Sequence, residues 1–142
     1  MRRITVVVAD SAPGWCAVCE SVLRYEKDIL IVAHAEQHDD VMAATVQLKP
    51  RILLCSLRLA ATAGYSLLAT LRQRCPATLG VVWTDDAVAE DQLIDALAHG
   101  ALGLLNRSDL QRQLAQAVRA VAGGEAWVPR KMLATIGDRL VG

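Results

Sequence analysis

The chain has 142 residues, the usual size of one compact domain, and 54% of them are hydrophobic. No stretch approaches the ~18 uninterrupted apolar residues that a membrane helix needs, and the Met-Arg-Arg start leads into a strand rather than a signal peptide. We therefore expect a cytoplasmic protein without membrane contact. Fifteen basic and fifteen acidic residues give a formal net charge of zero. The chain therefore lacks the strongly basic composition that is typical of a nucleic-acid-binding domain.

Short apolar runs alternate along the chain with segments of helical period. The runs are partly β-branched and almost without charge, as strands buried on both faces of a sheet are. This alternation predicts βα units around a parallel sheet. The predicted strands are Ile4–Ala9, Leu30–Ala35, Ile52–Ser56, Leu79–Thr84 and Leu102–Asn106.

The intervening segments carry apolar residues three and four apart, which predicts five helices with one buried face each. Pro13 suits the first turn of the first helix, and Gly123-Gly124 ends the fifth. After Ser56 we expect a turn, with Gly64 opening the third helix. The stripes are Trp15, Val18, Cys19 and Val22; Val41, Ala44, Thr45 and Leu48; Leu67, Leu68 and Leu71; Leu93, Ile94 and Leu97; and Leu110, Leu114, Ala117, Val118 and Val121.

The order of these elements predicts the fold class α/β, a doubly wound (βα)5 arrangement with a parallel five-stranded sheet in a three-layer sandwich. A short amphipathic segment follows residue 124, with Met132, Leu133, Ile136 and Leu140 on one side. It is too small to fold alone. It packs on the domain, pairs with another chain, or begins a connection to a further domain.

The four cysteines are expected to be small buried hydrophobes, because free cysteine is among the most buried residue types. Cys16 and Cys19 form a C-A-V-C pair, but neither a thioredoxin-like context nor the second ligand pair of a zinc site accompanies them. Cys55 ends the apolar run Ile52–Cys55, and three of the four cysteines lie at positions typical of a buried core. We therefore predict neither a redox nor a metal role.

Ligands and catalysis in doubly wound sheets are found at the carboxyl ends of the strands. The polar residues at those ends are the candidates for a functional site. They are Asp10 and Ser11 after the first strand, Ser56 after the third, Thr84 with Asp85 and Asp86 after the fourth, and Asn106 and Arg107 after the fifth. For Asp85 and Asp86 we favour capping of the fourth helix.

Four stretches are similar to receiver domains of bacterial response regulators, specifically those of the NarL/LuxR class. They are VVVAD at 6–10 with Pro13 after it, PRILLCSLRL at 50–59 with Gly64, HGALGLL at 99–105, and VRAVAGGEAWVP at 118–129. The resemblance covers almost the whole chain and implies a CheY-like, flavodoxin-like fold with a short C-terminal helical extension. It also implies a receiver-like domain at 1–124 and a linker at 125–142 toward a helix-turn-helix domain. In that case DNA is bound only through the helix-turn-helix domain.

The residues on which the family's chemistry depends are only partly present. Active receivers accept a phosphoryl group on an aspartate at the end of the third strand, where this sequence has Ser56. Two adjacent acids after the first strand hold Mg²⁺ in the family, and here they are Asp10 and Ser11. The resemblance thus implies a pocket without an aspartyl acceptor, with weak or absent Mg²⁺ binding and no other cofactor.

The family's switch residues are also changed in part. Thr84 matches the hydroxyl switch position, Leu104 replaces the aromatic switch residue, and Arg107 replaces the conserved lysine. We hypothesise that Arg107 reaches Asp10 and that the hydroxyls of Ser56 and Thr84 join by hydrogen bonds. The alternative is that Arg107 points into solvent and Asp10 caps a turn.

We predict a regulatory module that does not depend on aspartyl phosphorylation, with a homodimer or another regulatory protein as partner. A second hypothesis is a ligand-sensing module, in which a small molecule at the vacated pocket or the dimer surface controls output. An enzyme is disfavoured because Ser56 lacks a nucleophile elbow and a histidine partner. The histidines, His34, His38 and His99, fall outside the carboxyl-end loops or at helix termini.

Overall fold

The computed structural model describes residues 3–84 and 90–132 of the chain. One parallel sheet has the strand order β2-β1-β3-β4-β5. The predicted doubly wound α/β fold is therefore confirmed. The strands are β1 (Ile4–Ala9), β2 (Ile29–Ala35), β3 (Ile52–Ser56), β4 (Leu79–Thr84) and β5 (Ala101–Asn106).

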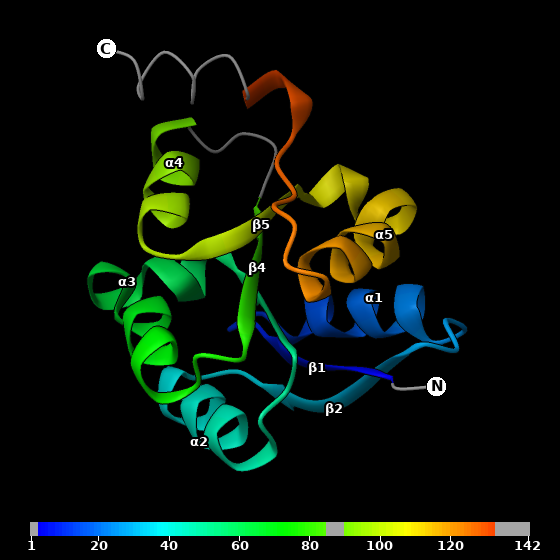
Figure 1. The fold of residues 1–142 in the computed structure, drawn as a ribbon, viewed down its shortest axis with the longest axis horizontal. Coiled ribbons are helices and arrows are strands. Elements are labelled where there is room, and N and C mark those ends of the chain that lie inside the picture. Colours follow the sequence, from blue (N-terminus) through cyan, green and yellow to red (C-terminus); the bar gives the residue numbers. More distant parts are fainter. Residues whose placement is uncertain (1–2, 85–89, 133–142) are drawn as a thin grey trace.

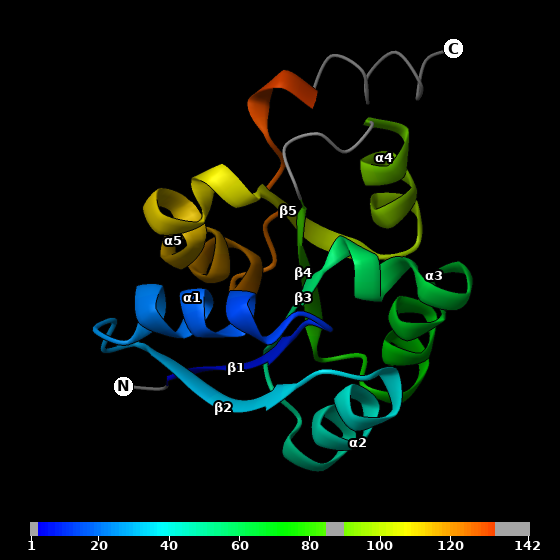
Figure 2. The same ribbon diagram turned by 180° about the vertical axis from the view of Figure 1, so that it is seen from behind.

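Helices cover both faces of the sheet (Figure 1). On one face lie α1 (Pro13–Leu23) and α5 (Leu110–Ala122), and the view from behind shows them side by side as well (Figure 2). On the other lie α2 (His38–Leu48), α3 (Leu57–Arg74) and α4 (Glu90–Ala98). Two short 3-10 helices, η1 (Arg107–Asp109) and η2 (Arg130–Met132), complete the described elements.

Alternation of side chains along the strands divides the core into two layers. In β1, Val7 packs with the cluster under α2, α3 and α4, whereas Val6 and Val8 pack with the cluster under α1 and α5. All three are completely buried. The four cysteines are free and buried, as the sequence predicts. Because both faces of the sheet are covered, polar groups reach solvent only at its ends and edges.

The predicted apolar stripe agrees with the observed burial most completely in α5, where all five predicted residues are buried. The stripe of α2 is partly wrong, because its buried residues are Val41, Met42 and Thr45 while Leu48 is 44% exposed. Leu48 is the last residue of α2, and the chain turns away from the helix direction at Lys49 with φ 47°. The last residue of the predicted stripe therefore lies at the exposed end of the helix.

The start of α3 differs from the expected turn. Helix begins directly at Leu57, and the Ser56 hydroxyl caps it by accepting a hydrogen bond of 3.3 Å from the backbone N–H of Leu59. The helix is then interrupted at residues 62–65, where Ala63, Gly64 and Tyr65 all have left-handed backbone angles. Gly64 therefore lies in a break within α3 rather than at its beginning.

Residues 125–132 pack against the sheet. Trp127 forms a parallel bridge with Gly103 on the edge strand β5, and Met132 is completely buried. Figure 1 shows this orange segment running alongside β5 between α5 and α4. Leu133, Ile136 and Leu140 lie outside the described residues. Within the described ranges, the helices are too short or too polar to cross a lipid bilayer.

Candidate functional site at the carboxyl end of the sheet

A cavity of about 280 Å³ opens at the carboxyl ends of β1, β3 and β4. It brings together four residues that the sequence predicts for the site. Three others are outside the lining: Ser11 is exposed, Leu104 is completely buried in β5, and Asn106 is buried at the end of β5. The lining residues are Asp10, Ala12, Trp15, Ser56, Leu57, Arg58, Ala61, Tyr65, Trp83, Thr84, Gln92 and Arg107.

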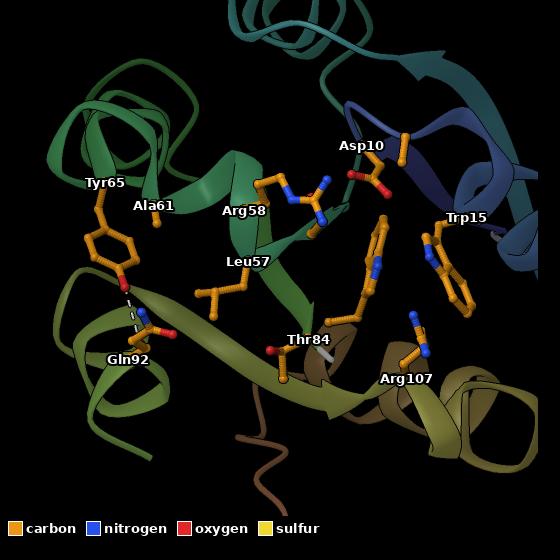
Figure 3. Close-up of a pocket in the computed structure, with 12 residues that line it drawn as sticks. Asp10, Trp15, Leu57, Arg58, Ala61, Tyr65, Thr84, Gln92 and Arg107 are labelled. Carbon is orange, nitrogen blue, oxygen red and sulfur yellow. Dashed lines mark hydrogen bonds between the residues drawn. The ribbon is translucent and has the colours of Figure 1, made fainter. Parts of the chain in front are cut away.

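Asp10 lies directly after β1 and is only 3% exposed. Its backbone N–H donates a 3.1 Å hydrogen bond to the carbonyl oxygen of Ala35, which fixes the residue against the end of β2. Figure 3 shows its carboxylate facing the cavity, with the guanidinium of Arg58 directed toward it. Asp10 is the single carboxylate among the described lining residues.

Ser56 lies at the end of β3 and is 7% exposed. Its hydroxyl oxygen is the N-cap acceptor of α3, so it satisfies one of the unpaired N–H groups of the first turn. The neighbouring Cys55 thiol is held in its protonated form. Burial, followed by the charge of Asp10, raises the pKa of Cys55 to about 12, so the thiolate is scarcely populated at neutral pH.

Arg107 does not form the predicted ion pair with Asp10 within the described part of the chain. Its guanidinium carbon lies 4.8 Å from the centroid of the Trp15 ring instead, and Figure 3 shows the two side chains next to each other. An exposed guanidinium stacked on an aromatic face keeps most of its hydration, whereas pairing with Asp10 requires burying it. Our hypothesis for this pair was therefore wrong.

Thr84 ends β4 and is 3% exposed at the cavity wall. The switch position on the next strand, Leu104, points into the core rather than into the cavity. The predicted helix-capping residues Asp85 and Asp86 lie outside the described residues. The Thr84 hydroxyl thus lies beside the cavity, whereas Leu104 is a buried aliphatic side chain.

Several lining residues were not predicted from the sequence as site residues. Trp15 was assigned to the helical stripe of α1, and Trp83 to a buried strand, yet both reach the cavity. Tyr65 stacks on His99 with ring centroids 4.5 Å apart, and its hydroxyl donates to the carbonyl oxygen of Gln92 at 3.2 Å. Aromatic residues at both ends of the cavity were not identifiable from spacing alone.

The described lining does not fit Mg²⁺. A hard cation of this kind requires several carboxylate or carbonyl oxygens and water, and here one carboxylate shares the cavity with Arg58 and Arg107. A wider search of the described residues finds no group of three histidine, cysteine, aspartate or glutamate side chains arranged to hold a metal ion. Among the described lining residues, the charges favour contact with an anion over contact with a cation.

Comparison with known proteins identifies the class. The model of the response regulator receiver domain matches residues 6–119, and the chain belongs to this family. A LuxR-family two-component response regulator from an Aurantimonas species has a similar fold, with a TM-score of 0.85, 18% identity and 99% coverage of both chains. The isolated receiver domain of RcsB from Salmonella enterica has a TM-score of 0.84 and 16% identity, covering 95% of this chain and 99% of that one.

Two curated regulators are similar in sequence. The transcriptional regulatory protein YxjL of Bacillus subtilis is 27% identical over 124 residues, which are 87% of this chain and 56% of YxjL. The oxygen regulatory protein NreC of Staphylococcus aureus is 26% identical over 139 residues, 96% of this chain and 63% of NreC. The chain thus spans less than two thirds of the length of these relatives. The match to the family model confirms the predicted receiver family.

Proposed function

We propose that this chain is an atypical receiver domain of a NarL/LuxR-type transcription regulator, and that its state is set without aspartyl phosphorylation. The observation that carries the proposal is the role of Ser56. Its hydroxyl occupies the end of β3, where the resemblance places the phosphoacceptor, and caps α3 by accepting from Leu59. Among the described residues, the hydrogen bond from Leu59 is the one that this oxygen makes, and a hydroxyl that is not hydrogen-bonded to a base is a poor nucleophile.

Mass spectrometry tests this proposal. The protein is incubated with acetyl phosphate or beryllium fluoride and Mg²⁺, and its intact mass and thermal midpoint are measured. We expect no phosphoryl adduct and no change in midpoint, because a ligand of the native state raises it. The double variant Ser11→Asp, Ser56→Asp restores the missing carboxylates and is the positive control. A phosphoryl adduct on the unmodified chain would contradict the proposal, and the Ser56→Ala variant would show whether Ser56 carries it.

The output of such a module is regulated protein association rather than catalysis. Residues 125–132 already cover the edge of β5, so we propose that a homodimer uses the surface of α1 and α5 instead. A groove between these helices is lined by Trp15, Val18, Leu110 and Gln111, together with Arg107 and Ser108. DNA is contacted only through a helix-turn-helix domain after residue 142.

Light scattering tests the association. We expect a dimer that Val18→Asp in the α1–α5 groove dissociates, while Gln47→Asp on the exposed side of α2 leaves it intact. Both variants add one negative charge to a helix, so the difference reports the surface rather than the charge. A monomer at high protein concentration, or equal effects of both variants, would contradict this surface.

A further inference from the structure

The cavity at the carboxyl end of the sheet combines aromatic rings with guanidinium groups, at the place where the proposed function has no phosphorylation. Aromatic rings reach it from α1, α3 and β4, as Trp15, Tyr65 and Trp83. Guanidinium groups reach it from α3 and η1, as Arg58 and Arg107. From this combination we infer that the cavity binds a small planar aromatic anion, a one- or two-ring compound that bears a carboxylate or phosphate group.

Size supports a ligand of this kind. A volume of about 280 Å³ lies at the lower end of the range of small-molecule sites. It is too large for a single ion and too small for a dinucleotide. Figure 3 shows the cavity extending from Trp15 and Arg107 on one side to Tyr65 and Gln92 on the other. An elongated space of this shape suits a flat ring system better than a compact polar metabolite.

The aromatic residues supply the apolar contact. Trp83 is 3% exposed and packed within the core under α1 and α5, so its ring is held in place before any ligand arrives. Trp15 is half-buried and has one face covered by the guanidinium of Arg107. A ring system inserted beside them is stabilised by offset or edge-to-face stacking.

The charged residues supply the preference for an anion. Arg58 and Arg107 carry two positive charges against one negative charge on Asp10 among the described lining residues. Each guanidinium has five N–H donors, so engagement with one group leaves others for a carboxylate or phosphate. Arg58 is exposed on the first turn of α3, and no ion pair of the described residues includes it. It is the side chain best placed to close over a bound anion.

A ligand held in this way connects elements that carry regulation. It touches α1 through Trp15, the broken helix α3 through Arg58 and Tyr65, α4 through Gln92, and η1, which precedes α5, through Arg107. The inference rests on the proposed function, because Mg²⁺ and a phosphoryl group would occupy the same space. Anion binding in place of phosphorylation then becomes the event that biases the α1–α5 surface.

Isothermal titration calorimetry on the full chain tests the inference. The probes are 2-naphthoate, 2-naphthyl phosphate and the neutral 2-naphthamide. We expect one or both anions to bind at least about tenfold more tightly than the amide, because a charge-assisted hydrogen bond contributes that much. The two anions distinguish a carboxylate site from a phosphate site. Equal affinity of all three probes, or no heat with either anion at about 1 mM, overturns the inference.

Matched variants locate the binding. Arg58→Gln is expected to weaken the anion about tenfold, whereas Arg74→Gln removes the same charge from the far end of α3, outside the lining. Trp15→Leu is expected to weaken all probes, whereas Tyr25→Leu removes an aromatic ring that is 84% exposed elsewhere. Binding that survives both lining variants overturns the site.

The failure of the inference is distinguishable from the failure of the proposed function. A phosphoryl adduct found by mass spectrometry contradicts the phosphorylation-independent receiver, whatever the probes do. A chain that forms no adduct and binds neither anion leaves the proposed function in place and overturns only the ligand class.

Discussion

The backbone N–H of Leu104 donates a 2.7 Å hydrogen bond to the carbonyl oxygen of Trp127, and the N–H of Trp127 donates to Leu102 at 3.1 Å. These bonds attach the C-terminal segment to the edge strand β5 at Leu104. An edge strand covered in this way is also protected from pairing with another chain. Strand β5 and the segment around Trp127 are therefore joined by backbone hydrogen bonds.

Gly103→Ala should destabilise the protein at this edge. A Cβ at Gly103 would lie 3.0 Å from a methyl carbon of Val121 and 3.1 Å from one of Val81. Both valines are completely buried and have little room to move, so we expect a loss of about 1–3 kcal/mol. Urea denaturation measures it. Gly14→Ala is the control, because it meets nothing within 4 Å and should raise stability by about 0.5–1 kcal/mol in helix α1.

Met132→Ala should show that the linker contributes to the stability of the domain. Met132 is completely buried in the core under α2, α3 and α4. Loss of its side chain should cost about 2–5 kcal/mol of unfolding free energy by leaving a cavity. Leu48→Ala, at a side chain 44% exposed, should cost about 0.5 kcal/mol or less. Equal effects in thermal or urea denaturation would show that residues 125–132 do not hold their place in solution.

Ala63→Gly should stabilise the broken helix α3. Ala63 has φ 53°, in the left-handed region that costs an L-residue about 1–2 kcal/mol. Glycine avoids that cost but loses more entropy on folding, so the expected net gain is about 0.5–1 kcal/mol. Ala43→Gly, in regular helix α2 and exposed, should instead destabilise by about 1 kcal/mol. A loss at both positions would contradict the left-handed backbone of residue 63.

Acid should weaken an ion-pair cluster between α5 and the turn before β2. Arg119 donates to both carboxylate oxygens of Asp28, at 2.8 and 2.9 Å, and to Glu26 at 2.6 Å. The hydrogen bond from Arg119 lowers the pKa of Asp28 below its ordinary value of 3.8. A lowered carboxyl pKa stabilises the folded state above 3.8, and this contribution is lost as pH falls through the folded pKa.

Arg119→Gln should therefore flatten the dependence of unfolding free energy on pH on the acid side. Urea midpoints measured from neutral pH to below pH 3.8 provide the comparison. Arg74→Gln, on exposed α3 outside the cluster, changes the net charge equally and should keep the slope. The same slope in all three proteins would show that Asp28 is not coupled to Arg119.

Much of the fold followed from the sequence. Buried strands in a parallel sheet have continuous apolar runs, so three of the five strands were predicted to the residue and the other two began one residue earlier. The stripe of α5 was complete because its period is regular over the whole helix. The break in α3 was missed because two of its three left-handed residues, Ala63 and Tyr65, are not glycine.

Sequence order alone determined which strand ends meet, because parallel strands bring their carboxyl ends to one edge. It placed Asp10, Ser56, Thr84 and Arg107 at one site, and the structure brings all four to one cavity. Only the tertiary structure decided their partners. Whether Arg107 approaches a buried carboxylate or an aromatic face depends on the balance of desolvation and packing between α1 and η1, which no local pattern encodes. In the structure Arg107 stacks on Trp15. The cavity beside this pair is bordered by aromatic rings and guanidinium groups.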